Sequence, residues 1–114
     1  MAYDEALATR VRTFLASEDA IDERRMMGSL VFLKNGNMLG GVNRAGLLVR
    51  VGAEGYDESL AQPHVRPMDF GDGRRPKGLV VVAPEGVTDD ADLHRWVGTG
   101  LAFAAKLPPK PGLG

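Results

Sequence analysis

Apolar and polar positions recur along the chain with the spacing of helices at both ends and of strands between them. Residues that share one helical face predict a first helix that ends near residues 16–17 and a last helix over 89–106. Their apolar positions are Leu7, Val11, Phe14 and Leu15 in the first helix and Leu93, Val97 and Leu101 in the last. A shorter helix is expected over residues 53–61.

Apolar runs separated by turn residues predict strands over 24–33, 38–42 and 47–51. Asn35-Gly36 joins the first two runs, and Asn-Gly favours a tight hairpin because both residues tolerate positive φ. Asn43-Arg44-Ala45-Gly46 predicts the next turn. Two further strands are expected later, an edge strand over 65–70, where Pro67 excludes a central position, and a strand over 77–83.

This order, α-β-β-β-α-β-β-α, predicts an α+β fold, a two-layer α/β sandwich with an antiparallel sheet. The chain has 114 residues, which fits one domain. We assign residues 1–107 to that domain and 108–114 to a Pro/Gly-rich extended tail, since prolines cannot continue the last helix. Gly98 and Gly100 within that helix predict a close approach to the sheet or to another chain.

The central strands carry apolar residues on both faces, because Leu30 and Phe32 point one way and Val31 and Leu33 the other. A sheet with one face in water alternates apolar and polar residues, so both faces are expected to be covered. Either helices cover both faces, or helices cover one and a second subunit, in a homodimer, covers the other.

Composition narrows the function classes. The chain has no cysteine, which excludes disulfides, thiolate metal sites and a cysteine nucleophile. Its net charge of −1 argues against a wholly basic nucleic-acid binder. No apolar run approaches the ~20 residues that span a bilayer, and the acidic N-terminus does not resemble a signal peptide. We therefore expect a cytoplasmic protein with no membrane partner.

Charge is unevenly distributed, with a net charge of −4 over residues 1–23 and of +4 over 24–82. Two basic clusters stand at the starts of expected strands: Arg24 and Arg25 at one, and Arg74, Arg75 and Lys77 at the other. If these strand ends lie close together, the five side chains form a patch that binds phosphate or an acidic partner. A solvated, charged sheet edge is the blander interpretation. Four methionines either form a soft interaction surface or, as is more typical, fill the core: Met26, Met27, Met38 and Met68.

Catalytic patterns are sparse. His64 and His94 lie far apart in the sequence, and no serine stands in a G-x-S-x-G elbow. Neither a dinucleotide-binding fingerprint nor a phosphate-binding loop occurs, and no His, Asp or Glu residues have metal-ligand spacing. We therefore predict no catalytic residues, no metal, no cofactor and no enzymatic activity.

The chain resembles the TfoX (Sxy) N-terminal domain family from about Met1 to Pro109. The residues that carry the resemblance are MAYDEALATRVR at the start, RRMMGSLVFLKNGNMLGGV at 24–42, LLVRVG at 47–52, RPMDF at 66–70 and KGLVVVAPE at 77–85. The family's K-M-F-G-G motif reads Arg25-Met26-Met27-Gly28-Ser29 here.

The resemblance implies a secretion-chaperone-like α+β domain. In that family the domain is followed by a helical C-terminal domain, and the whole protein acts with the cyclic-AMP receptor protein at competence promoters. This chain ends where the second domain would begin, so we expect a stand-alone N-domain. We expect a non-enzymatic regulatory domain that contacts a protein partner, such as a transcription regulator. Direct binding of nucleic acid or phosphate through the basic patch is the alternative.

Overall fold

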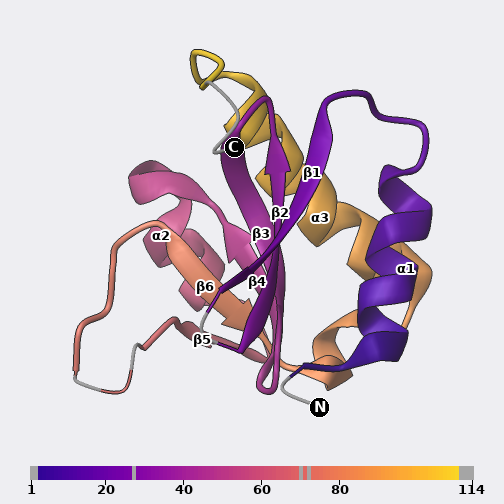
Figure 1. The fold of residues 1–114 in the computed structure, drawn as a ribbon. Helices are drawn as coiled ribbons and strands as arrows, with labels where there is room; N and C mark the ends of the chain where they lie inside the picture. Colours follow the sequence, from indigo (N-terminus) through magenta and orange to yellow (C-terminus); the bar gives the residue numbers. More distant parts are fainter. Residues whose placement is uncertain (1–2, 27, 70, 72, 111–114) are drawn as a thin grey trace.

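The computed structural model describes residues 3–26, 28–69, 71 and 73–110, and within them helices pack against a six-stranded antiparallel sheet (Figure 1). The strand order is β1-β2-β3-β4-β6-β5. The α+β fold predicted from the sequence is thus confirmed. In chain order the elements are α1 (Glu5–Leu15), β1 (Ile21–Met26), β2 (Ser29–Lys34), β3 (Asn37–Asn43), β4 (Gly46–Arg50), α2 (Gly52–Leu60), β5 (Val65–Pro67), β6 (Leu79–Val82), the 3₁₀ helix η1 (Pro84–Val87) and α3 (Asp90–Ala105).

Both predicted tight turns are present. Asn35 and Gly36 have φ of 53° and 80°, the positive values of the hairpin turn that the Asn-Gly pair predicts. In the next turn the Oδ1 atom of Asn43 accepts hydrogen bonds from the backbone N–H groups of Ala45 and Gly46, at 2.8 and 3.1 Å. The β3–β4 register is regular from its turn onward, whereas the β2–β3 register shifts between Phe32 and Leu33.

The expected strand over 24–33 is wrong in its bounds, because the structure has two strands there. β1 and β2 pair as a hairpin, and Gly28, with φ of 82°, lies in the turn between them. β1 was not predicted as a separate strand: residues 24–26 were included in the expected strand, and residues 21–23 were left out because their mostly charged side chains show no apolar pattern. Backbone pairing with β2 holds β1 in place. The sheet therefore has one strand more than expected. Met27 and Phe70, which fell in expected strands, lie outside the described residues, as do residues 111–114 of the expected tail.

The helices and the core lie on one face of the sheet. One buried cluster joins side chains of α1, α2 and α3 to the sheet residues that point the same way; those residues include Leu30, Phe32, Leu47, Val49, Val80 and Val82. In Figure 1 the sheet lies in front of α3, and α1 lies to the right of the sheet. The opposite face carries Val31, Leu33, Leu48 and Val81, which are buried but do not belong to that cluster. We call it the open face.

α3 approaches the sheet at one glycine. A Cβ atom on Gly100 would collide with the backbone oxygen of Leu39 in β3, whereas a Cβ on Gly98 would meet nothing within 4 Å. The close approach predicted for Gly100 is therefore present, and it is made to the sheet.

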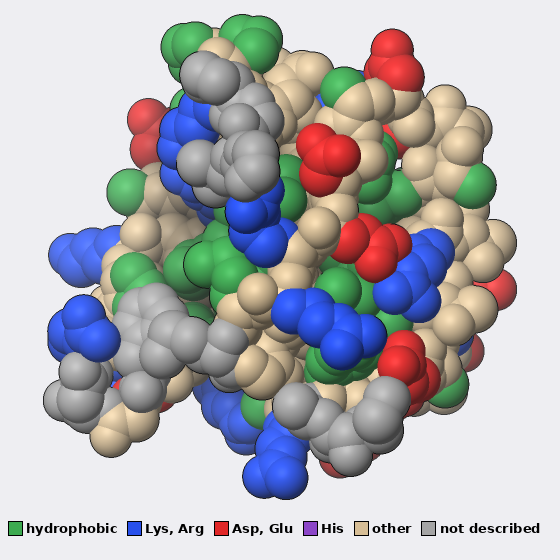
Figure 2. Space-filling model, in the orientation of Figure 1, with side chains coloured by type: hydrophobic (Ala, Val, Ile, Leu, Met, Phe, Trp, Pro, Cys, Tyr) green, Lys and Arg blue, Asp and Glu red, His purple; other side chains and the backbone are tan. Residues whose placement is uncertain are grey.

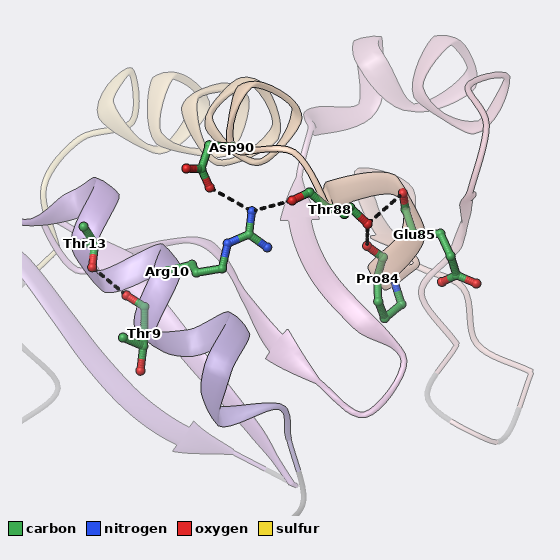
Figure 3. A network of polar contacts seen from close by, with 7 residues as sticks. All are labelled: Thr9, Arg10, Thr13, Pro84, Glu85, Thr88 and Asp90. Carbon is green, nitrogen blue, oxygen red and sulfur yellow. Dashed lines mark hydrogen bonds and ion pairs between the residues drawn. The ribbon is translucent and has the colours of Figure 1, made fainter.

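A set of polar contacts joins the helices of this layer. The Nη2 atom of Arg10 in α1 donates to the backbone oxygen of Thr88 at 3.2 Å and to Oδ1 of Asp90 at 3.0 Å (Figure 3). The Thr88 hydroxyl in turn donates to the backbone oxygen of Pro84 at 3.3 Å. These contacts join α1 to η1 and to the first turn of α3.

The segment after α3 lies against the β2–β3 turn. The backbone N–H of Lys110 donates to the oxygen of Asn35 at 2.8 Å. The side-chain amide of Asn37, only 1% exposed, donates to the oxygen of Pro108 at 2.9 Å. The described part of the expected tail is thus held by polar contacts to the domain.

Candidate functional site: a methionine hollow on the open face

The open face contains an apolar hollow of about 550 Å³. We call it the methionine hollow, because its walls include Met26, Met38 and Met68, with Val31, Leu48 and Leu79 on the sheet. Met26 is 50% exposed, which is an unusually large exposed fraction for a large apolar residue. Figure 2 shows hydrophobic side chains in a depression left of centre, bordered by Lys and Arg side chains. The described methionines thus line a surface, and the core-filling interpretation is wrong for them.

The pairing of the strands explains why this surface is apolar in the middle and cationic at its margins. Directly opposed residues in antiparallel strands share a face. One such row crosses the whole sheet, and in order it contains Arg24, Val31, Gly41, Leu48, Val81 and Arg66. The two arginines end the row on the edge strands β1 and β5, and the four residues between them are apolar or glycine.

Two smaller hollows adjoin the methionine hollow. The first, of about 400 Å³, shares Met68 and Asp69 with it and is lined by Arg66 and Arg75; we call it the arginine hollow. The second, of about 390 Å³, shares Met38 and Leu79 with the methionine hollow. It is lined by Arg50 and Lys77, and we call it the lysine hollow.

Asp69 is held in its charged form between the methionine and arginine hollows. Its carboxylate accepts a hydrogen bond from the backbone N–H of Gly71 at 2.7 Å and faces the Nε atom of Arg75 at 3.4 Å. The Gly71 hydrogen bond, and secondarily the Arg75 contact, lower the pKa of Asp69. Asp69 therefore partly neutralises Arg75, whereas Arg44 and Arg66 show no ion pair among the described contacts at this end of the surface.

Arg50, at the lysine hollow, is oriented by two neighbours. Its Nη1 atom donates to the backbone oxygen of Met38 at 3.3 Å, and its guanidinium lies 5.2 Å from the centre of the Phe103 ring. Such contacts restrict the side chain and present a fixed, partly buried cation.

The five basic residues predicted as a patch are not gathered at one point. Arg24 points to the open face, but Arg25 pairs with Leu30 and points to the opposite one. Three strands separate β1 from β6, which follows the segment that carries Arg74, Arg75 and Lys77. Arg75 and Lys77 line different hollows. Arg24, Arg75 and Lys77 therefore lie at different places on the open face and Arg25 faces away from it. Binding of phosphate at a single patch remains a prediction.

Sequence reasoning missed Arg44, Arg50 and Arg66, which line the three hollows. For Arg50, the alternation of side chains along a strand was a usable signal: Arg50 lies two residues after Leu48, so both side chains are on the same face of the sheet. The convergence itself depends on the order of the strands, which local patterns do not reveal.

The two histidines occupy separate places. His64 is exposed between α2 and β5, and the His94 ring stacks on Phe14 with 4.5 Å between centroids. Within the described ranges, no group of three or more His, Cys, Asp or Glu side chains could hold a metal ion. The helices that the structure describes include none with the length and apolar character of a membrane span.

Comparison with known proteins gives one match. The family model of the TfoX N-terminal domain matches residues 13–104 of the 114-residue chain. The matched range includes the whole sheet and the residues that line the three hollows. No curated protein and no solved structure shows significant similarity to the chain.

Proposed function

We propose that this chain, which belongs to the TfoX N-terminal domain family, is a non-enzymatic interaction domain that binds a protein partner in the methionine hollow. The family is shown by the match over residues 13–104. A regulatory role in transcriptional control, in the cytoplasm, is the part of the proposal that rests on the resemblance to the competence regulator.

The observation that carries the proposal is the apolar hollow on a sheet face whose described helices all pack on the other side. When a partner covers apolar side chains such as Met26, the free energy falls by roughly 25 cal/mol for each Å² of apolar surface removed from water. Methionine suits this role because its flexible thioether adapts to the shape of a partner. The hollow has a volume of about 550 Å³, which is enough for several apolar side chains of a protein segment.

Direct binding of nucleic acid is supported less strongly. It requires several cations along one continuous surface, and Arg25 points away from Arg24 and from the hollows. The surface between the cations is lined by methionines and aliphatic side chains, with no aromatic residue for base stacking among the described residues of the methionine hollow.

Site-specific photo-cross-linking tests the proposal. A photoreactive residue replaces Met26 at the hollow in one variant and Thr9 on α1 in a control, and each is irradiated in an extract of the cells that make the protein. Thr9 is exposed, and its hydroxyl donates to the backbone oxygen of Glu5 in its own helix. We expect a discrete protein adduct at position 26 that is absent at position 9.

A second variant, Ala45→Trp, places a large ring at a position that lines both the methionine and arginine hollows. It should abolish the adduct at position 26 while the melting temperature stays near that of the unmodified protein. Equal adducts at positions 26 and 9, or no protein adduct at 26, would contradict the proposal. An adduct with nucleic acid at position 26 would favour the alternative function.

A further inference from the structure

The three hollows adjoin one another, and the chemistry of their walls has a defined order. The methionine hollow shares residues with the arginine hollow on one side and with the lysine hollow on the other. An apolar centre is therefore flanked by cations at both ends, with Arg66 and Arg75 at one end and Arg50 and Lys77 at the other. Arg44 adds a further cation to the wall of the methionine hollow.

The charge of this surface is strongly one-sided. Among the described residues that line the hollows there are five cations, and Asp69 is the single acid; the cations are Arg44, Arg50, Arg66, Arg75 and Lys77. The whole chain nevertheless has a net charge of −1. Six of its acidic residues lie within positions 1–23, from the N-cap of α1 to the first half of β1. The positive potential therefore belongs to this surface and is not a property of the whole molecule.

We propose that the occupant of the open face is an acidic, amphipathic protein segment, whose apolar side chains enter the methionine hollow and whose carboxylates flank them on both sides. This inference rests on the proposed function and specifies its partner. Opposite charge steers such a segment to the surface and sets its register, and the buried apolar side chains supply most of the affinity. The row that begins at Arg24 and ends at Arg66 has the complementary order of charges.

Charge also argues against a second copy of this chain on the same face. Two open faces brought together would set two surfaces that both carry an excess of cations against each other. Like charges across an interface oppose association. A homodimer through this face is therefore expected to be weaker than the complex with an acidic segment.

Fluorescence anisotropy with labelled synthetic peptides and the full chain tests the inference. The first peptide has a leucine-rich centre flanked by glutamates. The second has lysines in place of the glutamates, and the third keeps the glutamates but has serines in place of the leucines. We expect the first peptide to bind at least about tenfold more tightly than either of the others, and added salt to weaken its binding.

Charge reversal identifies the surface that binds. Arg66→Glu should weaken binding of the first peptide by about tenfold, and Arg66→Lys should retain most of it. Arg95→Glu makes the same change of charge on α3, outside the lining of the hollows, and should leave affinity nearly unchanged. Circular dichroism of each variant confirms that it is folded.

Three outcomes overturn the inference. These are equal binding of the glutamate and lysine peptides, equal binding of the serine peptide, and an affinity that Arg66→Glu does not change. Absence of binding by the first peptide, or self-association seen by light scattering that the peptide does not reverse, also overturns it. A protein adduct at position 26 together with any of these results would leave the proposed function standing and reject only the acidic segment.

Discussion

Leu47 and Leu48 are neighbours in β4, and they face opposite layers of the molecule. Leu47 belongs to the core cluster between the sheet and the helices, whereas Leu48 forms part of the wall of the methionine hollow. Both side chains are nearly inaccessible to solvent, at 2% and 4% exposure, so burial alone does not distinguish them.

Truncation of each leucine should separate the two layers. Leu47→Ala creates a cavity enclosed by core side chains and should lower the free energy of unfolding by about 3 kcal/mol. Leu48→Ala enlarges a hollow that is already open, so its cost should be below about 2 kcal/mol. Urea denaturation of both variants measures the difference. Equal costs would contradict the description of the second face as open.

The glycines of α3 give a second matched pair. Gly100→Ala forces the helix away from Leu39 and should destabilise the protein by more than about 2 kcal/mol. Gly98→Ala meets open space and should stabilise it by up to about 1 kcal/mol, since alanine favours the helix more than glycine does. Thermal melts of the two variants should shift in opposite directions. A shift of the same sign in both would show that α3 does not approach β3 at Gly100.

An ion pair links α1 to the edge strand β1. Arg12 donates to both carboxylate oxygens of Glu23, at 2.7 and 2.9 Å, and this hydrogen bonding lowers the pKa of Glu23. A lowered pKa means that the stabilisation is present above the pKa of the unfolded chain and is lost as the pH falls through the folded-state value.

Glu23→Gln should therefore destabilise the protein at neutral pH, by less than about 1 kcal/mol because the pair is exposed, and should have almost no effect in strong acid. Urea denaturation at the two pH values measures this. Glu58→Gln, at an exposed position on α2, is the control and should have little effect at either pH. A larger effect in acid than at neutral pH would refute the assignment.

The contact between Asn37 and Pro108 predicts how the C-terminal segment is held. Asn37→Ala removes a buried donor and should cost about 1–3 kcal/mol. The Lys110 amide, which bonds to Asn35, should then exchange its hydrogen faster. Lys110→Ala should leave that exchange slow, because the contact is made by the backbone. Unchanged exchange in Asn37→Ala would show that the segment is held by other contacts.

Local patterns predicted the elements whose signals are local. The Asn35-Gly36 turn follows from φ preferences, and α3 follows from the four-residue spacing of Leu93 and Val97. β1 escaped prediction as a separate strand because an edge strand of charged residues has no apolar alternation, and its pairing with β2 holds it in the sheet.

The candidate site was predicted only in part. Methionines and basic residues were both recognised in the sequence, but as separate features. Their combination depends on the tertiary shape of the sheet, because Met26 of β1 and Met68 next to β5 come from its two opposite edges and still line the same hollow. Nothing local in the sequence joins positions so far apart, and Arg66 therefore could not be assigned to the site.

Because the helices and the core cluster lie behind the sheet, most of the side chains that stabilise the fold are separate from those that line the three hollows. Side chains such as Met26, Arg44 and Arg66 can be exchanged at little cost to the free energy of unfolding, since they contribute nothing to the core cluster. The same scaffold can therefore be redesigned to bind a different target by changing only the side chains of the open face, while Phe32, Trp96 and the other core residues are kept.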